Sequence, residues 1–109
     1  MVNFENENRY SFKRVSGLVL DMQPRLLGGI AEKDDLVDAV SIFCKAMNLF
    51  DIRTVITEQV PSKLGETATQ ISSLCTDSPR FSKKTFSAFG ESSFASWVEK
   101  EKIQHLIIT

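Results

Sequence analysis

Short strand-like segments alternate with amphipathic segments along this chain. Three of the strand-like segments are rich in apolar or β-branched residues and cover 16–21, 52–57 and 104–109. A further short strand is expected near 80–83. Between the first two segments, apolar residues recur at i, i+4, i+7, i+11 and i+14 from Leu36 to Phe50, which is the spacing of one helix face. This pattern predicts a helix from about residue 32 to 50, with Cys44 on its apolar side.

Two further helices are expected in the second half of the chain. Thr67 and Gln70 have the spacing of a capping box, in which each side chain bonds the free backbone N–H of the other, and they predict a helix over about 67–75. Ser92 or Ser93 can cap a second helix, whose core-facing residues would be Phe94, Trp97 and Val98. Pro24 with Gly28-Gly29, and the stretch 61–65, indicate loops after the first two strands.

This alternation predicts an α/β fold. Strands separated by helices pair in parallel through right-handed crossovers, so we expect a Rossmann-like parallel sheet flanked by helices. Open sheets of this kind bind ligands beyond the carboxyl ends of their strands. The residues to consider are therefore those at the strand exits, which are Asp21, 57–59, 82–84 and whatever follows Thr109.

Composition and charge narrow the possible partners. A chain of 109 residues with 42% hydrophobic and 25% charged content is typical of one globular domain. Thirteen basic residues against fourteen acidic ones give a net charge of -1, which provides no field to attract nucleic acid or a membrane surface. Residues 1–14 form a polar N-terminal extension without the apolar stretch of a secretory signal, so a cytoplasmic location is expected.

The two cysteines, Cys44 and Cys75, lack the close spacing of a zinc or redox motif. Both fall on apolar helix positions, so we expect reduced thiols that serve as small core residues. His105 begins the last strand without a partner motif and is predicted to lie on the surface, whereas Trp97 is predicted to lie in the core.

Four segments of the chain resemble the isochorismatase-like cysteine hydrolases of the branch that uses no metal. Their order and spacing are similar to those of that family, and together they extend over about 17–109. The segments are Gly17-Leu-Val-Leu-Asp-Met-Gln23, Thr57-Glu-Gln-Val-Pro-Ser-Lys-Leu-Gly-Glu-Thr67, Phe81-Ser-Lys-Lys-Thr-Phe-Ser-Ala-Phe-Gly90 and Leu106-Ile-Ile-Thr109. The resemblance implies that 15–109 is the N-terminal part of an isochorismatase-like domain that is incomplete at its C-terminus.

The resemblance also implies roles for individual residues. It implies that Asp21 is the general base and that Lys83, rather than its neighbour Lys84, is the catalytic lysine of an Asp-Lys-Cys triad. The nucleophilic cysteine of the family would follow the closing strand and is absent from this chain. Gln23, Glu58 and Gln59 either border the substrate or hydrogen-bond the loops. The second-strand loop carries Glu58 and Gln59 and no histidine, so neither a metal nor another cofactor is expected.

Two functions of different classes follow. The first is hydrolysis of an amide or a related C–N or C–O bond in a small molecule. Such an enzyme is inactive without its cysteine, and the family resemblance favours a homo-oligomer. The second is a catalytically inactive interaction module that uses an exposed sheet edge. A nucleotide-binding domain is disfavoured because neither Gly-x-Gly-x-x-Gly nor a phosphate-binding Gly-Lys-Ser/Thr loop occurs.

Overall fold

The computed structural model describes residues 12–109. Of the predicted extension 1–14, residues 1–11 lie outside the described part, and Phe12–Arg14 form a 3-10 turn, η3. The elements that follow, in chain order, are β1 (Val15–Leu20), α1 (Pro24–Leu27), α2 (Lys33–Leu49), β2 (Arg53–Gln59), α3 (Pro61–Leu64), α4 (Thr69–Ser72), β3 (Arg80–Lys83), η4 (Ala88–Gly90), α5 (Ser92–Lys100) and β4 (His105–Ile108).

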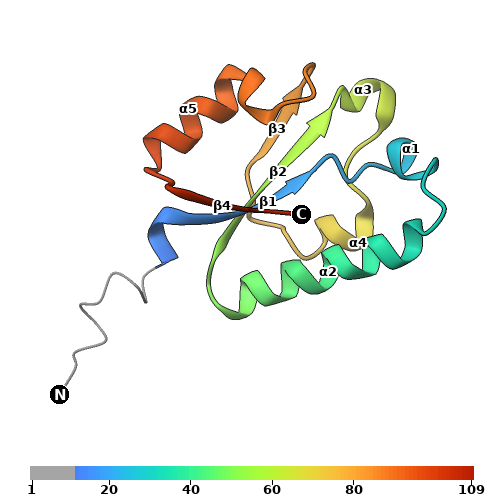
Figure 1. Cartoon of the computed structure of the whole chain (residues 1–109), viewed down its shortest axis with the longest axis horizontal. Helices are drawn as coiled ribbons and strands as arrows, with labels where there is room; N and C mark the ends of the chain where they lie inside the picture. Colours follow the sequence, from blue (N-terminus) through green and yellow to red (C-terminus); the bar gives the residue numbers. More distant parts are fainter. Residues whose placement is uncertain (1–11) are drawn as a thin grey trace.

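The strands form one parallel sheet in the order β3-β2-β1-β4, so the α/β fold is as predicted (Figure 1). Leu18 of β1 is in register with Val55 of β2 on one side and with Ile108 of β4 on the other. On the far side of β2, Gln59 is in register with Lys83 of β3. All strand exits therefore share one edge of the sheet, as the sequence pattern required.

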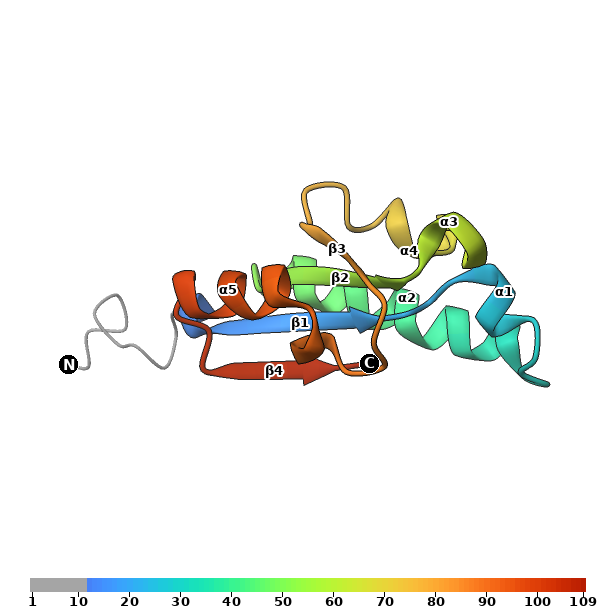
Figure 2. The same cartoon turned by 90° about the horizontal axis from the view of Figure 1, so that it is seen from above.

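Helices cover both faces of the sheet (Figures 1 and 2). Because successive strand residues point to opposite faces, Val19 and Ile56 pack toward α2 and α4, while Leu18 and Val55 pack toward α5. Phe94 is fully buried in the second of these layers, with Trp97 packed beside it. Three layers with two apolar cores result, and no helix among residues 12–109 is long and apolar enough to cross a lipid bilayer.

Helix α2 confirms the predicted long amphipathic helix, but the last residue of the predicted apolar stripe, Phe50, is not buried. Val40, Cys44 and Met47 are buried against the sheet. Phe50 is instead 58% exposed, because it lies just beyond the helix end, where the backbone has left the helical conformation. A position that matches a helical stripe is buried only while the helix continues.

The predicted helix caps are wrong. Thr67 uses its hydroxyl and its backbone N–H to bind Glu58, and Gln70 donates to Asp38 of α2 at 2.8 Å, so neither side chain caps α4. The helix is correspondingly short, Thr69–Ser72. In α5 the N-cap residue is Glu91, and its side chain makes no capping hydrogen bond. Ser92 and Ser93 lie inside the helix, so neither serine is the cap.

Two segments predicted as loops each contain one helical turn. Both turns, α1 and α3, begin at a proline, Pro24 and Pro61, whose fixed φ suits the first position of a helix and whose missing N–H costs nothing there. These turns lie beyond the carboxyl ends of β1 and β2 (Figure 1). They therefore border the edge of the sheet where the predicted site residues lie.

Candidate active site at the carboxyl edge

The candidate site lies where the strand order reverses. The chain builds the sheet outward from β1 to β2 and β3, and then returns to place β4 on the other side of β1. The connections on the two sides of β1 run over opposite faces, which leaves a crevice beyond the ends of β1 and β4. Thr109 lies at this crevice, donating its N–H to Leu18 O at 3.1 Å and accepting the Leu20 N–H at 3.4 Å.

Asp21 and Lys83 meet at this edge. Lys83 Nζ lies 2.7 Å from Asp21 Oδ2, which is the proximity expected from their strand-exit positions. The lysine starts from the end of β3 and reaches across β2 to the end of β1. Thr57, the residue of β2 between them, donates its hydroxyl to Asp21 Oδ1 at 3.2 Å. The carboxylate is thus held at both oxygens, by an ammonium and by a hydroxyl.

Lys83 is the most enclosed charged side chain of the site, with 1% of its surface exposed. Besides Asp21, its ammonium has three acceptors, which are Gln59 Oε1 at 2.7 Å, Thr85 O at 2.8 Å and Phe86 O at 2.9 Å. A lysine carries three N–H donors, so the four acceptors, Asp21 included, use its full capacity and fix its position. The neighbouring Lys84 is exposed and, as expected, takes no part in this contact.

Asp21 has an unusual backbone conformation. Its φ is 54°, in the left-handed region that side chains other than Gly, Asn and Asp adopt only at a cost. Its N–H donates to Thr57 O at 3.1 Å, and its C=O accepts from Gln23 N at 3.0 Å. The sharp turn at the end of β1 aims the carboxylate along the sheet edge toward Lys83 instead of away from the protein.

Gln23 is buried and binds only backbone groups. Its Nε2 donates to Gln59 O at 2.9 Å and Gly65 O at 2.6 Å, and its Oε1 accepts from Gln59 N at 2.6 Å. These bonds fasten the loop after β1 to the loop after β2. Of the two interpretations open for Gln23, this geometry supports loop structure over contact with substrate.

Replacing Gln23 by Leu is expected to lower the free energy of unfolding by about 2 kcal/mol, because a buried N–H and two carbonyls lose their partner. Urea denaturation measures this loss. Gln70→Leu is the matched control, since Gln70 makes one exposed hydrogen bond, and its effect should stay within about 0.5 kcal/mol. Equal losses in the two variants would show that Gln23 does not fasten the loops.

Glu58, like Gln23, uses its side chain to hydrogen-bond a loop. Its Oε2 accepts from Thr67 N at 2.6 Å and from Thr67 Oγ1 at 2.8 Å, and Arg80 lies 3.7 Å away. The side chain is buried and directed into the loop after β2. Gln59, in contrast, is partly exposed and contacts Lys83 directly. Of the three predicted substrate neighbours, Gln59 alone is thus placed beside the Asp21–Lys83 pair.

Sequence reasoning missed Thr57 and the turn after β3. Thr57 directly precedes Glu58 near the end of β2. The strand-exit rule listed it as part of 57–59 but assigned it no role. The carbonyls of Thr85 and Phe86 carry no sequence signal, because any residue supplies a C=O. Among residues 12–109, no three His, Cys, Asp or Glu side chains are grouped so as to hold a metal ion.

Fold and site together define a three-layer parallel α/β protein with a buried lysine–carboxylate pair at its switch-point crevice. The model of the isochorismatase domain family matches residues 17–109. This chain therefore belongs to the isochorismatase domain family. A comparison with curated protein sequences gave no match.

Several solved structures share this fold. The YcaC gene product from Escherichia coli, described as an octameric hydrolase of unknown specificity, has a TM-score of 0.80 at 20% identity over 90% of this chain and 50% of its own. The MAR1 ribonuclease from Caenorhabditis elegans gives 0.75 at 22% identity, over 89% of this chain and 50% of its own. YcaC from Pseudomonas aeruginosa, solved with covalent acrylamide, gives 0.75 at 16% identity, over 90% and 50%. The chain thus spans about half the length of these structures.

Proposed function

We propose that this chain supplies the base and the cation of a cysteine hydrolase that acts on an amide or a related bond of a small molecule. The observation that carries the proposal is the Asp21–Lys83 contact of 2.7 Å at the switch-point crevice, next to Thr109. In the proposed enzyme, the nucleophilic cysteine belongs to the segment that follows β4, as in the family that the sequence resembles. That segment would enter the crevice directly from Thr109.

The chemistry assigns one step to each group. A cysteine attacks as its thiolate, so the reaction begins when Asp21 accepts the thiol proton and the sulfur bonds the carbonyl carbon. Asp21 then returns the proton to the leaving amine as the C–N bond breaks, and a thioester remains. Water hydrolyses the thioester and frees the thiol, with Asp21 again accepting and returning a proton.

The surroundings of Asp21 suit this role. An ionised carboxylate has about four acceptor positions, and Lys83 and Thr57 take two of them, which leaves Asp21 able to accept from a thiol or a water. The Asp21 side chain retains 19% exposure, whereas that of Lys83 has none. A buried cation beside the reacting carbon stabilises negative charge that develops on the carbonyl oxygen.

The test compares the 109-residue chain with a version that continues past Thr109 through the rest of the domain. A panel of small amides should be hydrolysed by the longer version, and not by the 109-residue chain, whose thiols lie away from Asp21. In the longer version, replacing the first cysteine after Thr109 by Ala should abolish turnover. Turnover by the 109-residue chain that disappears with Cys44→Ala or Cys75→Ala would overturn the proposal.

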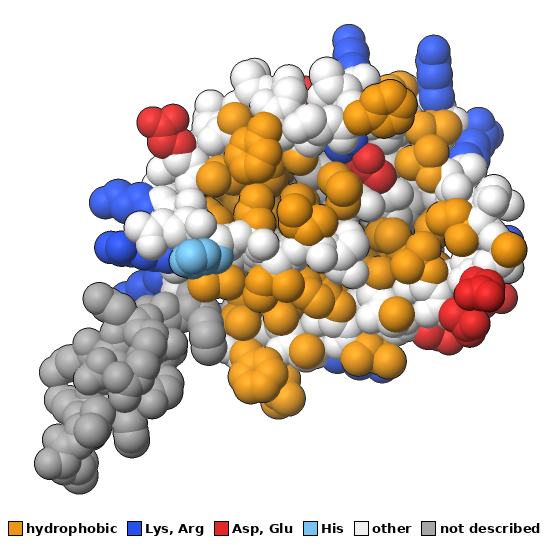
Figure 3. Space-filling model, in the orientation of Figure 1, with side chains coloured by type: hydrophobic (Ala, Val, Ile, Leu, Met, Phe, Trp, Pro, Cys, Tyr) orange, Lys and Arg blue, Asp and Glu red, His pale blue; other side chains and the backbone are white. Residues whose placement is uncertain are grey.

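A second candidate function rests on the free edge of β4. Within residues 12–109, β4 pairs with β1 on one side and has no strand on the other. Ile107 and Ile108 on this edge are 41% and 61% exposed, and apolar side chains gather on the face of the molecule that carries it (Figure 3). An exposed apolar edge with open backbone groups favours pairing with another chain, as an interaction module requires.

Self-association through this edge is therefore expected for the 109-residue chain. Light scattering at increasing concentration should show dimers or larger species, and Ile108→Lys should shift them toward monomer, because a charge on an edge strand opposes pairing. Ile42→Lys is the matched control, since Ile42 is 66% exposed on α2 and lies outside the edge strand. A wild-type chain that stays monomeric throughout would count against the interaction module.

A further inference from the structure

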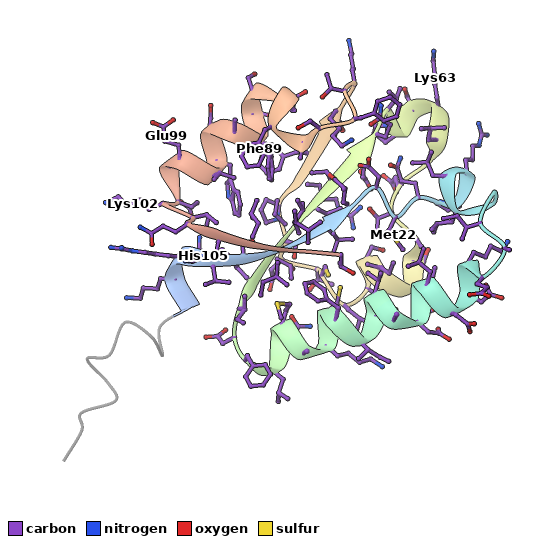
Figure 4. The ribbon with its side chains drawn as sticks, in the orientation of Figure 1. Met22, Lys63, Phe89, Glu99, Lys102 and His105 are labelled. Carbon is purple, nitrogen blue, oxygen red and sulfur yellow. The ribbon has the colours of Figure 1, made fainter. Side chains whose placement is uncertain are left out.

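Two thiols meet in the core layer between α2 and the sheet. Cys44 belongs to α2 and Cys75 follows α4, and their Sγ atoms are 3.4 Å apart. Both are free thiols with 0% and 4% exposure, and sulfur atoms are visible in this layer in Figure 4. A disulfide has an S–S distance of about 2.05 Å, so a small movement of one side chain would close the bond.

The two segments that carry these thiols are fastened together. Asn48 Nδ2, at the end of α2, donates to Leu74 O at 2.9 Å, directly before Cys75. Gln70 Nε2 donates to Asp38 Oδ1 of α2 at 2.8 Å. These hydrogen bonds connect α2 with the segment 70–75 at two places, so the approach of the sulfurs follows from the local fold.

Cys75 is the more accessible of the two thiols. It lines a cavity of about 880 Å³ at the amino edge of the sheet, together with Thr54, Asp77, Ser78 and Pro79. Cys44 lies behind it and does not line this cavity. The cavity opens at the strand beginnings, whereas Asp21 and Lys83 lie at the strand ends, so chemistry here is separate from the proposed hydrolase site.

Polar neighbours favour the thiolate of Cys75. The hydrogen bond between the two thiols is the largest effect that lowers the pKa of Cys75, to about 6. The hydroxyls of Thr54 and Ser78 and the charge of Arg80 act in the same direction, and burial opposes them. The same contact raises the pKa of Cys44 well above its usual range, and burial adds to this effect. One thiol of the pair is thus prepared to attack and the other to remain protonated.

We propose that Cys44 and Cys75 form a reversible intramolecular disulfide, in which Cys75 reacts first with a hydroperoxide. The Cys75 thiolate bonds the terminal peroxide oxygen, the O–O bond breaks, and hydroxide or alkoxide leaves, so the sulfur is oxidised to a sulfenic acid and the peroxide is reduced. Cys44 Sγ then bonds Cys75 Sγ, the S–O bond breaks, and the hydroxide leaves as water with the Cys44 proton. A dithiol reductant reverses the reaction by attack on the disulfide.

The consequence is a covalent connection between α2 and the segment that joins β2 to β3. That segment holds Gly65 and Thr67, which bind Gln23 and Glu58 beside the carboxyl edge. Oxidation would therefore restrict the mobility of the loops next to the proposed hydrolase site. Formation of the disulfide requires only the contact between Cys44 and Cys75 and is independent of the proposed hydrolase function.

The test treats the folded 109-residue chain with hydrogen peroxide, blocks the remaining thiols under denaturing conditions, and maps the products by mass spectrometry. The expected product is one chain lighter by two hydrogen atoms, in which the tryptic peptides 34–45 and 64–80 are joined until a reductant is added. The rate should reach half its maximum near pH 6, instead of near the pKa of about 8.5 of a free cysteine.

Two matched variants test which thiol reacts first. In Cys44→Ala, a sulfenic acid should persist at Cys75 and be labelled by dimedone, whereas Cys75→Ala should leave Cys44 at least tenfold less labelled. Circular dichroism verifies that each variant is folded. The proposal is overturned if both thiols of the wild type remain free, if cross-links form only between chains, or if Cys44 takes the label.

Discussion

Asp21→Asn, introduced into the version of the protein that continues past Thr109, is expected to lower kcat/KM by about 10²–10⁴-fold, the contribution of a general base. The amide keeps the shape of the side chain and its hydrogen bond from Lys83, but it cannot accept the thiol proton. Asn also tolerates the left-handed backbone of Asp21, whose φ is 54°, so the turn at the end of β1 is kept. The loss of the charge opposite Lys83 lowers the free energy of unfolding, so turnover is compared where circular dichroism shows that the variant is folded. The loss should fall mainly on kcat, measured with the best amide of the panel.

Asp51→Asn provides the control for this substitution. Asp51 has nearly the same backbone conformation, with φ 55°, and is exposed after the end of α2, far from Lys83. Its replacement should leave kcat/KM unchanged within about twofold, because surface changes of this kind have small effects. If Asp21→Asn retained full turnover while the cysteine after β4 remained essential, Asp21 would not be the base.

Lys83→Met is expected to lower the free energy of unfolding of the 109-residue chain by about 3 kcal/mol. Removing one partner of a buried ion pair leaves the other charge without compensation, and here Gln59 and two carbonyls lose their donor as well. For a domain of this size, about 3 kcal/mol is a large part of its total stability. Urea denaturation followed by the fluorescence of Trp97, the single tryptophan, measures the change.

Lys84→Met is the matched control, because Lys84 is the adjacent lysine and is exposed. Its effect should remain within about 0.5 kcal/mol. The double variant Lys83→Met with Asp21→Asn should be less destabilised than the sum of the two single variants, since removing both charges leaves neither unpaired. Equal small losses for Lys83→Met and Lys84→Met would show that the buried pair does not stabilise the fold.

The sequence predicted the fold class from local patterns, and it placed Asp21 and the segment with Lys83 at one edge of the sheet from the order of the strands. The choice of Lys83 over Lys84 came from the family resemblance. Strand and helix periodicities are properties of neighbouring residues, and they identified β1, α2, β2, β3, α5 and β4 within a few positions. Parallel pairing then places all strand exits at one edge, so carboxylates and lysines that follow strands gather there. The proximity of Asp21 and Lys83 needed no knowledge of side-chain packing.

Tertiary structure decided the partners of the remaining polar side chains. Thr67 and Gln70 have the local spacing of a capping box, but Glu58 and Asp38 bind them instead, from segments that only the folded chain brings near. Gln23 was open to two interpretations because its hydrogen bonds reach the loop after β2. Such contacts depend on how loops pack, which short-range periodicity does not encode.

The contact between Cys44 and Cys75 also depends on how distant segments pack. Each was predicted as a small core residue, and burial confirms that prediction. Their contact at 3.4 Å joins positions separated by 31 residues, a spacing that matches no cysteine motif. By itself the sequence determined that both thiols lie inside the protein; only the packing of α2 against the segment after α4 decided that they lie against each other.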